Sequence, residues 1–386
     1  MENQAIKVTW HSGALPDPAI GMLDQLYAHL HSSAAYYSVY GVLATDTHAC
    51  VLESDGKTVA VFLFRHEGKR ILVVNEQCAF PPAAVDAFAE QAFDRHPDVE
   101  MIAFTAILSA ATKRFPSVSA KRTQDIVLTL PASEEQYLAQ MGKSTRAYIK
   151  RYLNKLKRCH PTVSWVTYER GEVPRDQLLA VIELNRARMA SRFKTSYIDD
   201  AETDRIMSLV ERCGLVTIMT IDGKVCAGTI NYRVADNYFL QVIAHDPAYD
   251  EHGLGTLCCY LTACECIRRK GREYHFLWGR YEYKYRLLGV QHDLSDVLIF
   301  RSSLHRLRHA DTVIRFGING KLYEIKDWAE AHARRQDNSS FAGRAVHTAM
   351  NSLKKLKRGA DRIRMRSDAH GVLADVPVRH SPPNVS

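Results

Sequence analysis

Alternating hydrophobic and polar positions mark two parts of the chain that share one pattern. Residues 49–74 and 215–243 are rich in β-branched and aromatic residues, and each stretch predicts short antiparallel strands. Tight turns separate the predicted strands, since an acidic residue followed by glycine is typical of two-residue hairpins. These turns lie at Asp55-Gly56, Glu67-Gly68 and Asp222-Gly223.

The two stretches align when one is shifted by 167 residues. The shift superimposes Ala60 on Ala227 and keeps apolar positions in register. It also superimposes the two turns Asp55-Gly56-Lys57 and Asp222-Gly223-Lys224. We interpret the match as an internal duplication, with a chance match of a common turn as the alternative.

Each stretch is followed by a predicted helix and then by another strand. The helices are expected at 83–95 and 255–270, and the strands at 99–107 and 273–278. Sheet, helix and strand in this order predict two α/β units, each a mixed, mainly antiparallel sheet flanked by helices. We place the units at 1–130 and 131–300, followed by a basic helical extension at 301–366 and a disordered tail at 367–386.

A basic amphipathic helix is predicted between the two units. Ser133 has the position of an N-cap for a first short helix, and a second helix is expected from 143 to 158. Its apolar stripe leaves Arg146 and Lys150 on other faces. This basic surface is either solvated or a contact for an anionic substrate or cofactor.

Charge is concentrated at the C-terminal end. The net charge is +8, and residues 301–386 hold 17 Lys and Arg against 8 Asp and Glu. Helices are expected there at 302–310, 320–335 and 341–360. Such a region is a solvated helix end, a surface for RNA or anionic membrane, or a dimer contact, and the sequence does not predict the oligomeric state.

Composition favours a cytoplasmic location. No apolar run approaches the length of a membrane helix, and the N-terminus lacks the basic start and apolar middle of a signal peptide. The nine cysteines are irregularly spaced and include no CxxC pair, so neither a disulfide framework nor a metal site is expected from them.

A glycine turn at the start of the helix expected at 255–270 is the main candidate for a binding site. Gly253 and Gly255 open the helix directly after a strand, where several backbone N–H groups point outward at the positive end of the helix dipole. Residues 252–256 therefore predict a pyrophosphate cradle. The motif is neither a P-loop nor the dinucleotide fingerprint, because the surrounding glycines and lysine are missing.

Sheet, glycine turn, helix and strand in this order resemble the GCN5-related N-acetyltransferase (GNAT) superfamily. Its Q/R-x-x-G-x-G/A signature is matched at both glycines, with Asp250 at the first position. The chain is also similar to the CelD-type and FemAB-like group of tandem units. That resemblance rests on KSTRAYIKRYLNKL (143–156), HGLGTL (252–257) and GRYEYKYRLLG (279–289), with His275 where relatives have aspartate.

The resemblance implies an acyl-CoA donor, acetyl-CoA or longer, and an amine acceptor on a small molecule, an amino sugar or a peptide. It implies a donor site at Ile243, Ala244, His252, Gly253, Leu254, Gly255 and Thr256, and substrate contacts from Arg146 and Lys150. For proton transfer and oxyanion stabilisation, the candidates are Asp246, His275, Tyr283 and Lys284. Each also has an ordinary structural interpretation, as a turn residue, a core residue or a surface lysine. No metal cofactor is expected.

Two other functions fit the same sequence. A FemAB-like enzyme would take an aminoacyl group from tRNA, bound through the basic C-terminal region. An inactive member would act as a scaffold in a biosynthetic complex.

Overall fold

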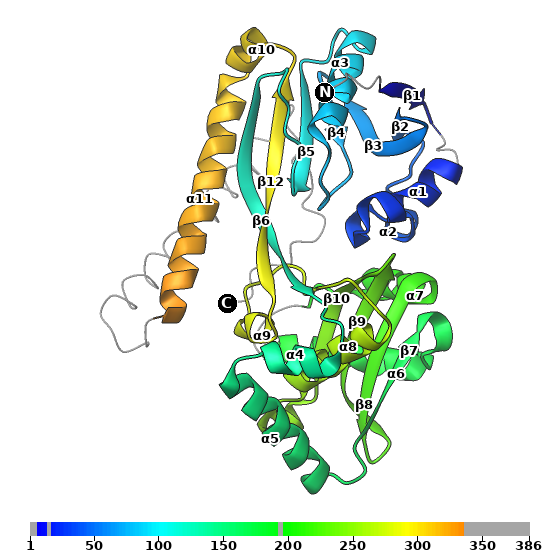
Figure 1. Cartoon of the computed structure of the whole chain (residues 1–386), viewed down its shortest axis with the longest axis vertical. Coiled ribbons are helices and arrows are strands. Elements are labelled where there is room, and N and C mark those ends of the chain that lie inside the picture. The colour runs from blue at the N-terminus through cyan, green and yellow to red at the C-terminus, as the bar shows by residue number, and fades with distance from the viewer. Residues whose placement is uncertain (1–5, 14–16, 192–195, 336–386) are drawn as a thin grey trace.

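A computed structural model describes residues 6–13, 17–191 and 196–335 (Figure 1). Within these residues the strands form one continuous sheet in the order β1-β2-β3-β4-β5-β12-β6-β11-β10-β9-β8-β7. The strands are β1 (Lys7–His11), β2 (His48–Ser54), β3 (Lys57–Glu67), β4 (Arg70–Val73), β5 (Met101–Ile107), β6 (Ser117–Thr129), β7 (Ser164–Glu169), β8 (Gly214–Ile221), β9 (Lys224–Val234), β10 (Asn237–His245), β11 (Glu273–His275) and β12 (Val290–Phe300).

Helices cover both halves of this sheet. They are α1 (Asp17–Tyr27), α2 (Ala34–Val39), α3 (Pro82–Arg95), α4 (Glu134–Gln140), α5 (Lys143–Cys159), α6 (Arg175–Ser191), α7 (Asp200–Cys213), α8 (Leu254–Arg268), α9 (Glu282–Arg286), α10 (Ser303–Arg308) and α11 (Ala310–Arg335), with short 3-10 turns η1 (Leu30–Ser32), η2 (Arg170–Glu172) and η3 (Pro247–His252). The predicted fold class, two mainly antiparallel units flanked by helices, is confirmed.

The two halves of the sheet correspond strand by strand. Both DG turns join their strands with the aspartate and glycine in the left-handed region, as a type I′ hairpin requires. A register shift follows Leu52 in the first hairpin and Met219 in the second, again 167 residues apart. The same bulge at the same spacing supports the predicted duplication.

Each half of the sheet includes one strand from the other half of the chain. In the first half β4 pairs in parallel with β5, and β5 pairs with β12, a strand from the end of the second half. In the second half β10 pairs in parallel with β11, and β11 pairs with β6. Figure 1 shows β6 and β12 running together from one half to the other. The proposed domain boundary at 130/131 falls just after β6, and it stays a prediction.

Each half buries its own aromatic and aliphatic core. In the first half Phe62, Phe80 and Phe88 lie against one another between the sheet and α3, with ring centroids 4.3–4.4 Å apart around Phe62. In the second half α8 is buried along most of its length. Cys258, Cys259, Cys264 and Cys266 are buried on this helix, as expected for packing residues.

The C-terminal extension packs along the exchanged strands. Helix α11 contacts β6, and Gly320 lets it approach Ala120 closely. The predicted helix at 302–310 corresponds to α10, and the one at 320–335 is the later part of the longer α11. The expected helix at 341–360 and the expected tail at 367–386 lie outside the described residues.

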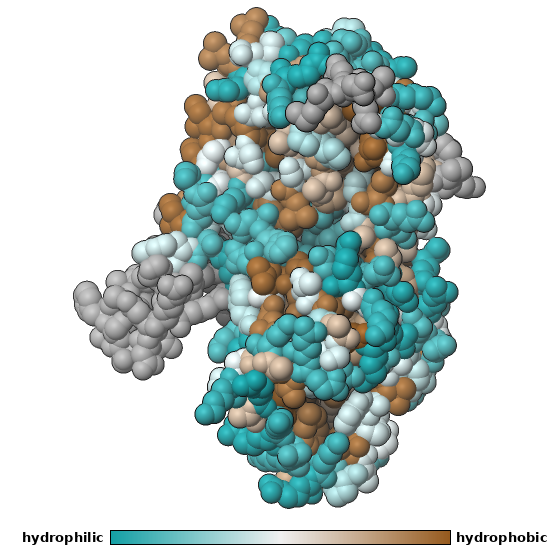
Figure 2. Space-filling model, in the orientation of Figure 1, coloured by the Kyte–Doolittle hydropathy of each residue, from teal (hydrophilic) through white to brown (hydrophobic). Residues whose placement is uncertain are grey.

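Hydrophobic side chains are exposed along this extension, beside its basic residues. Figure 2 shows apolar surface on the face that carries α10 and α11. Exposed apolar side chains there include Leu304, Leu307, Ile314 and Trp328. The described part of the extension is therefore not the purely polar, basic surface that charge alone indicates. None of the described helices is both long and apolar enough to cross a membrane.

Candidate functional site

Strands β10 and β11 separate early, and this opens the sheet of the second half. They pair over only three residues, from Asn237 opposite Glu273 to Phe239 opposite His275. Beyond that point β10 continues to His245 along β9, with a bulge between Leu240 and Val242. Among the described residues, one edge of β10 therefore lacks a neighbouring strand over its second part.

The predicted cradle lies at the far end of this edge. After β10 the turn η3 ends at Gly253, whose φ of 61° and ψ of 33° are left-handed. Helix α8 starts with Leu254, so the first-turn N–H groups of Leu254, Gly255 and Thr256 have no carbonyl of their own helix to bond. A Cβ atom on Gly253 would meet the hydroxyl oxygen of Tyr148, which would have to move, and the left-handed φ is itself strained for any residue other than glycine.

Side chains that the sequence did not single out cover the cradle. Tyr148 of α5 reaches Gly253, forms a hydrogen bond with Thr256 and packs against Tyr152 with ring centroids 4.2 Å apart. His245 lies over Gly255, its Nδ1 3.2 Å from the position of a Cβ there. A phosphate group would therefore meet the Tyr148 hydroxyl before the backbone.

Asp250 and His252 make local contacts around this turn. Asp250, at the signature's Gln/Arg position, accepts a hydrogen bond or ion pair from Nε2 of His245 at 2.8 Å. His252 is buried, with Nε2 3.3 Å from Nε2 of His160, and burial lowers its pKa. Because His252 is buried, it packs inside the turn, whereas Asp250 bonds to His245.

Asp246 and Lys284, two predicted catalytic residues, have clear structural partners. The Asp246 carboxylate accepts from the backbone N–H of Ala248 at 2.9 Å and so caps η3. Lys284 is buried, and its Nζ donates to the carbonyl oxygens of Phe276, Leu277 and Trp278. Burial lowers the pKa of Lys284 to about 7. These contacts favour a positioning role for Lys284, which fastens α9 to the segment after β11.

Tyr283 lies beside this lysine, half-buried against the ring of Phe276 at a centroid distance of 6.3 Å. Burial raises the pKa of its phenol well above 10. The hydroxyl is therefore protonated at neutral pH, as a proton donor to a thiolate must be.

His275 belongs to a buried group that we call the His29–Asp125–His275 cluster. Nδ1 of His275 lies 2.6 Å from Oδ2 of Asp125, and Nε2 of His29 lies 3.6 Å from the same oxygen. Burial alone would lower the pKa of His275, but the Asp125 carboxylate raises it to about 9. Phe239 of β10 stacks on His275 with ring centroids 4.4 Å apart, so the cluster lies where β10 and β11 part.

Strand β10 therefore joins the cradle and the cluster. Phe239 and His245 are six residues apart on an extended strand, which corresponds to ~20 Å. The predicted donor residues Ile243 and Ala244 lie between them on the part of β10 that pairs with β9 alone, Ile243 half-buried and Ala244 buried. Of the predicted donor residues, Ile243 and Ala244 thus lie on β10 itself, between the cradle that follows this strand and Phe239, which is paired with His275 of β11.

The predicted substrate residues of α5 differ in exposure. Arg146 donates from Nη1 to the carbonyl of Ala139 at 3.0 Å, which fastens α5 to α4. Lys150 is exposed. Lys150 is thus the freer of the two to meet an anion.

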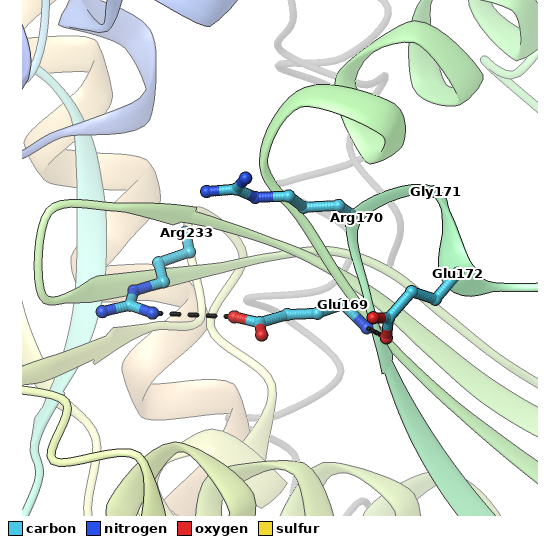
Figure 3. Close-up of a pocket in the computed structure, with 5 residues that line it drawn as sticks. All are labelled: Glu169, Arg170, Gly171, Glu172 and Arg233. Atoms are coloured by element: carbon cyan, nitrogen blue, oxygen red, sulfur yellow. Dashed lines mark hydrogen bonds and ion pairs between the residues drawn. The ribbon is translucent and has the colours of Figure 1, made fainter.

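A polar hollow of about 530 Å³ lies elsewhere in the second half (Figure 3). Its lining residues are Glu169, Arg170, Gly171, Glu172 and Arg233. Glu169 is held by Arg233 at 3.6 Å and by Arg269 at 2.8 Å, so its charge is already paired. None of the predicted site residues lines this hollow.

Sequence reasoning missed His29, Asp125, Tyr148 and His245. Asp125 had a usable signal, because it is a lone carboxylate within an otherwise buried strand end, Asp125 to Leu128. His29 had none, since it lies in a loop of the first half and reaches the cluster only through the fold.

Comparisons with known proteins agree with this architecture. Residues 143–285 match the family model described as an acetyltransferase (GNAT) domain, and no curated protein matches the chain. FemX shares 9% identity with it, at a TM-score of 0.54 over 75% of this chain and 97% of that chain. This likeness concerns the fold alone.

Two further solved structures are more distant in shape. The C-terminal domain of a putative lysylphosphatidylglycerol synthetase from Agrobacterium fabrum shares 14% identity, at a TM-score of 0.47 over 77% of this chain and 96% of that chain. A tandem GNAT protein from the clavulanic acid biosynthesis pathway shares 15% identity, at a TM-score of 0.37 over 76% of this chain and 98% of that chain. Both TM-scores are below 0.5, so neither likeness supports a statement about function.

Proposed function

We propose that this chain, which belongs to the GNAT superfamily through its acetyltransferase domain at 143–285, is an acyl-CoA-dependent N-acyltransferase. The observation that carries the proposal is the course of β10, which runs from the N-terminus of α8 to the cluster at His275. A donor with a phosphate group at one end and a reactive acyl group at the other fits such a path.

The parts of coenzyme A match this path in order. Its pyrophosphate would meet the first-turn N–H groups of α8, which favour anions. Its extended pantetheine arm would follow the unpaired edge of β10 past Ala244 and Ile243, where backbone groups lack a neighbouring strand. The thioester would then lie near the bulge and Phe239.

The reaction itself is an acyl transfer from sulfur to nitrogen. The amine nitrogen attacks the thioester carbonyl and forms the new C–N bond, and the C–S bond breaks. A base takes the amine proton and an acid protonates the leaving thiolate. We keep Tyr283 as the proposed acid for the thiolate, because its phenol is protonated at neutral pH. We assign the base to none of the other predicted residues, because Asp246 and Lys284 have structural partners and His275 is paired with Asp125, which raises the pKa of His275 to about 9.

Thermal shift with a donor panel tests the proposal. Acetyl-CoA or a longer acyl-CoA should raise Tm, because a ligand that binds only the folded state stabilises it, and deacylated tRNA should not. Gly253→Ala should abolish the shift, because a Cβ there meets Tyr148. Gly223→Ala is the matched control, since Gly223 also has positive φ but open space around it. A panel without any CoA-dependent shift contradicts the proposal.

Tyr148 and Asp250 favour one alternative, a FemAB-like transferase that uses aminoacyl-tRNA. The Tyr148 hydroxyl already fills the cradle, and the Asp250 carboxylate adds negative charge beside it, both unfavourable for a pyrophosphate. The exposed basic residues of α5, Lys150 among them, suit a nucleic-acid backbone. Salt-sensitive tRNA binding without any CoA response would favour this function, and a lack of both responses would favour a scaffold.

A further inference from the structure

Three potential metal ligands from distant parts of the chain meet in the His29–Asp125–His275 cluster. His29 precedes η1 in the first half, Asp125 lies on β6, and His275 ends β11. One donor atom from each lies within 4.8 Å of the other two, and all three residues are buried. No local sequence motif brings them together, so the fold itself makes the group.

The cluster holds more hydrogen-bonding capacity than its partners use. Nε2 of His29 and Oδ1 of Asp125 are buried and have no hydrogen-bond partner among the described residues. Their side chains are only 5% exposed. Nε2 of His275 is also buried without a hydrogen bond, with Oε2 of Glu273 at 3.5 Å as its nearest charged neighbour. Buried polar atoms without a hydrogen-bond partner are uncommon in proteins, so this group has donor and acceptor capacity left for a ligand.

We propose that His29, Asp125 and His275 bind one divalent transition-metal ion, with Zn²⁺ as the best fit. Two imidazole nitrogens and a carboxylate oxygen form a donor set that suits Zn²⁺ and its neighbours better than Mg²⁺ or Ca²⁺. The ion neutralises a carboxylate that is otherwise buried with one close partner, and it joins the two halves of the sheet. This proposal differs from the sequence-based expectation that no metal is bound.

Small shifts adapt the cluster to such an ion. The 2.6 Å contact between His275 and Asp125 is a hydrogen bond, so the ion takes the place of the shared proton. Ligand bonds of about 2.0–2.2 Å at tetrahedral angles separate ligand atoms by about 3.3 Å. The 3.6 Å separation of His29 from Asp125 already agrees with this value, and His275 needs to move by less than about 1 Å.

The chain provides an internal control in a second, exposed group, His66, His96 and Asp98. His66 and Asp98 form an ion pair of 3.5 Å near the surface, where the side chains are already solvated. Ions bound there would be weak and readily removed. The double variant His66→Ala/His96→Ala should therefore leave tight metal binding unchanged.

Metal content and metal-dependent stability test the proposal on the full chain. After dialysis against a chelator, addition of Zn²⁺ should restore one bound ion per chain by mass spectrometry and raise Tm by several degrees, whereas Mg²⁺ should not. Co²⁺ should give the visible absorption of a low-symmetry nitrogen and oxygen site. Asp125→Asn and His29→Ala should each reduce Zn²⁺ affinity at least tenfold.

The Co²⁺ spectrum of the unaltered chain tests for a bound ion even where a variant of the His29–Asp125–His275 cluster fails to fold. A chain that takes up no ion, or that loses it in the His66→Ala/His96→Ala variant, overturns the proposal. In a metal-bound chain His275 is a ligand and cannot transfer protons. Acyl-CoA binding at the α8 cradle is measured separately, so failure of the metal site and failure of the proposed function are distinguishable.

Discussion

The two halves of the sheet share their strands but differ where a helix follows the fourth strand. In the second half Gly253 caps α8 and Gly255 lies in its first turn, and the first-turn N–H groups face outward. In the first half α3 begins at Pro82 after Pro81, and proline has no N–H to offer. The same architecture therefore offers an anion site in only one half.

A second difference lies in what the halves hold in place. The first half fastens the C-terminal extension through Glu100, which accepts from Lys69, Arg308 and His309. The second half uses a buried lysine for its own turn after β11. The comparison shows that two similar units differ in use, since one supports the extension while the other holds the glycine turn of the candidate site.

The largest expected effect is from Lys284→Met, which removes a buried donor from three carbonyl oxygens. Leaving these acceptors without a partner should lower the free energy of unfolding by about 3 kcal/mol or more. Denaturant unfolding measures it. Lys69, exposed in the first half, is the control, and Lys69→Met should cost much less. A stable Lys284→Met protein with abolished activity would instead support the predicted catalytic role.

Glu100→Gln should make the stability of the chain less dependent on pH, because Glu100 holds the C-terminal extension through its charge. Hydrogen bonds from Lys69, together with those from His309 and Arg308, lower the pKa of Glu100 from 4.5 to about 2. A lowered folded-state pKa gives stability that is complete above pH 4.5 and lost as the pH falls toward 2. The unaltered chain should therefore exceed the variant in Tm at pH 6, and the gap should narrow below pH 4.5. A gap that stays constant with pH would contradict this assignment.

Gly56→Ala and Gly223→Ala should cost nearly the same stability if the two hairpins are equivalent. Both glycines have positive φ, 72° and 75°, and open space around them, so each substitution adds only backbone strain of about 1–2 kcal/mol. Chemical denaturation of the two variants measures the difference. Losses that differ by more than about 1 kcal/mol would show that the hairpins are not energetically equivalent.

The sequence predicted most of the fold because its signals are local. DG turns, alternating strands and capped helices are set by neighbouring residues, so both hairpins, α3, α5 and α8 were placed within a few residues. The pairing of β6 and β12 with strands of the opposite half has no local signal, because it depends on contacts between strands that are far apart in the sequence. The candidate site divides in the same way, since the glycine turn is local whereas His29, Asp125 and Tyr148 arrive from distant segments.

The smallest expected effect concerns the hydroxyl of Tyr148, which distinguishes an open cradle from one that is already filled. Tyr148→Phe keeps the ring packed against Tyr152 but removes the oxygen next to Gly253 and Thr256. Because that oxygen occupies the place of a phosphate oxygen, its removal should strengthen acyl-CoA binding by about fivefold, the equivalent of one hydrogen bond. Calorimetric titration measures the change, and Tyr152→Phe serves as the control. Weaker binding in Tyr148→Phe would instead identify the hydroxyl as a phosphate ligand, and the second half would then hold its donor with a side chain as well as with the backbone of α8.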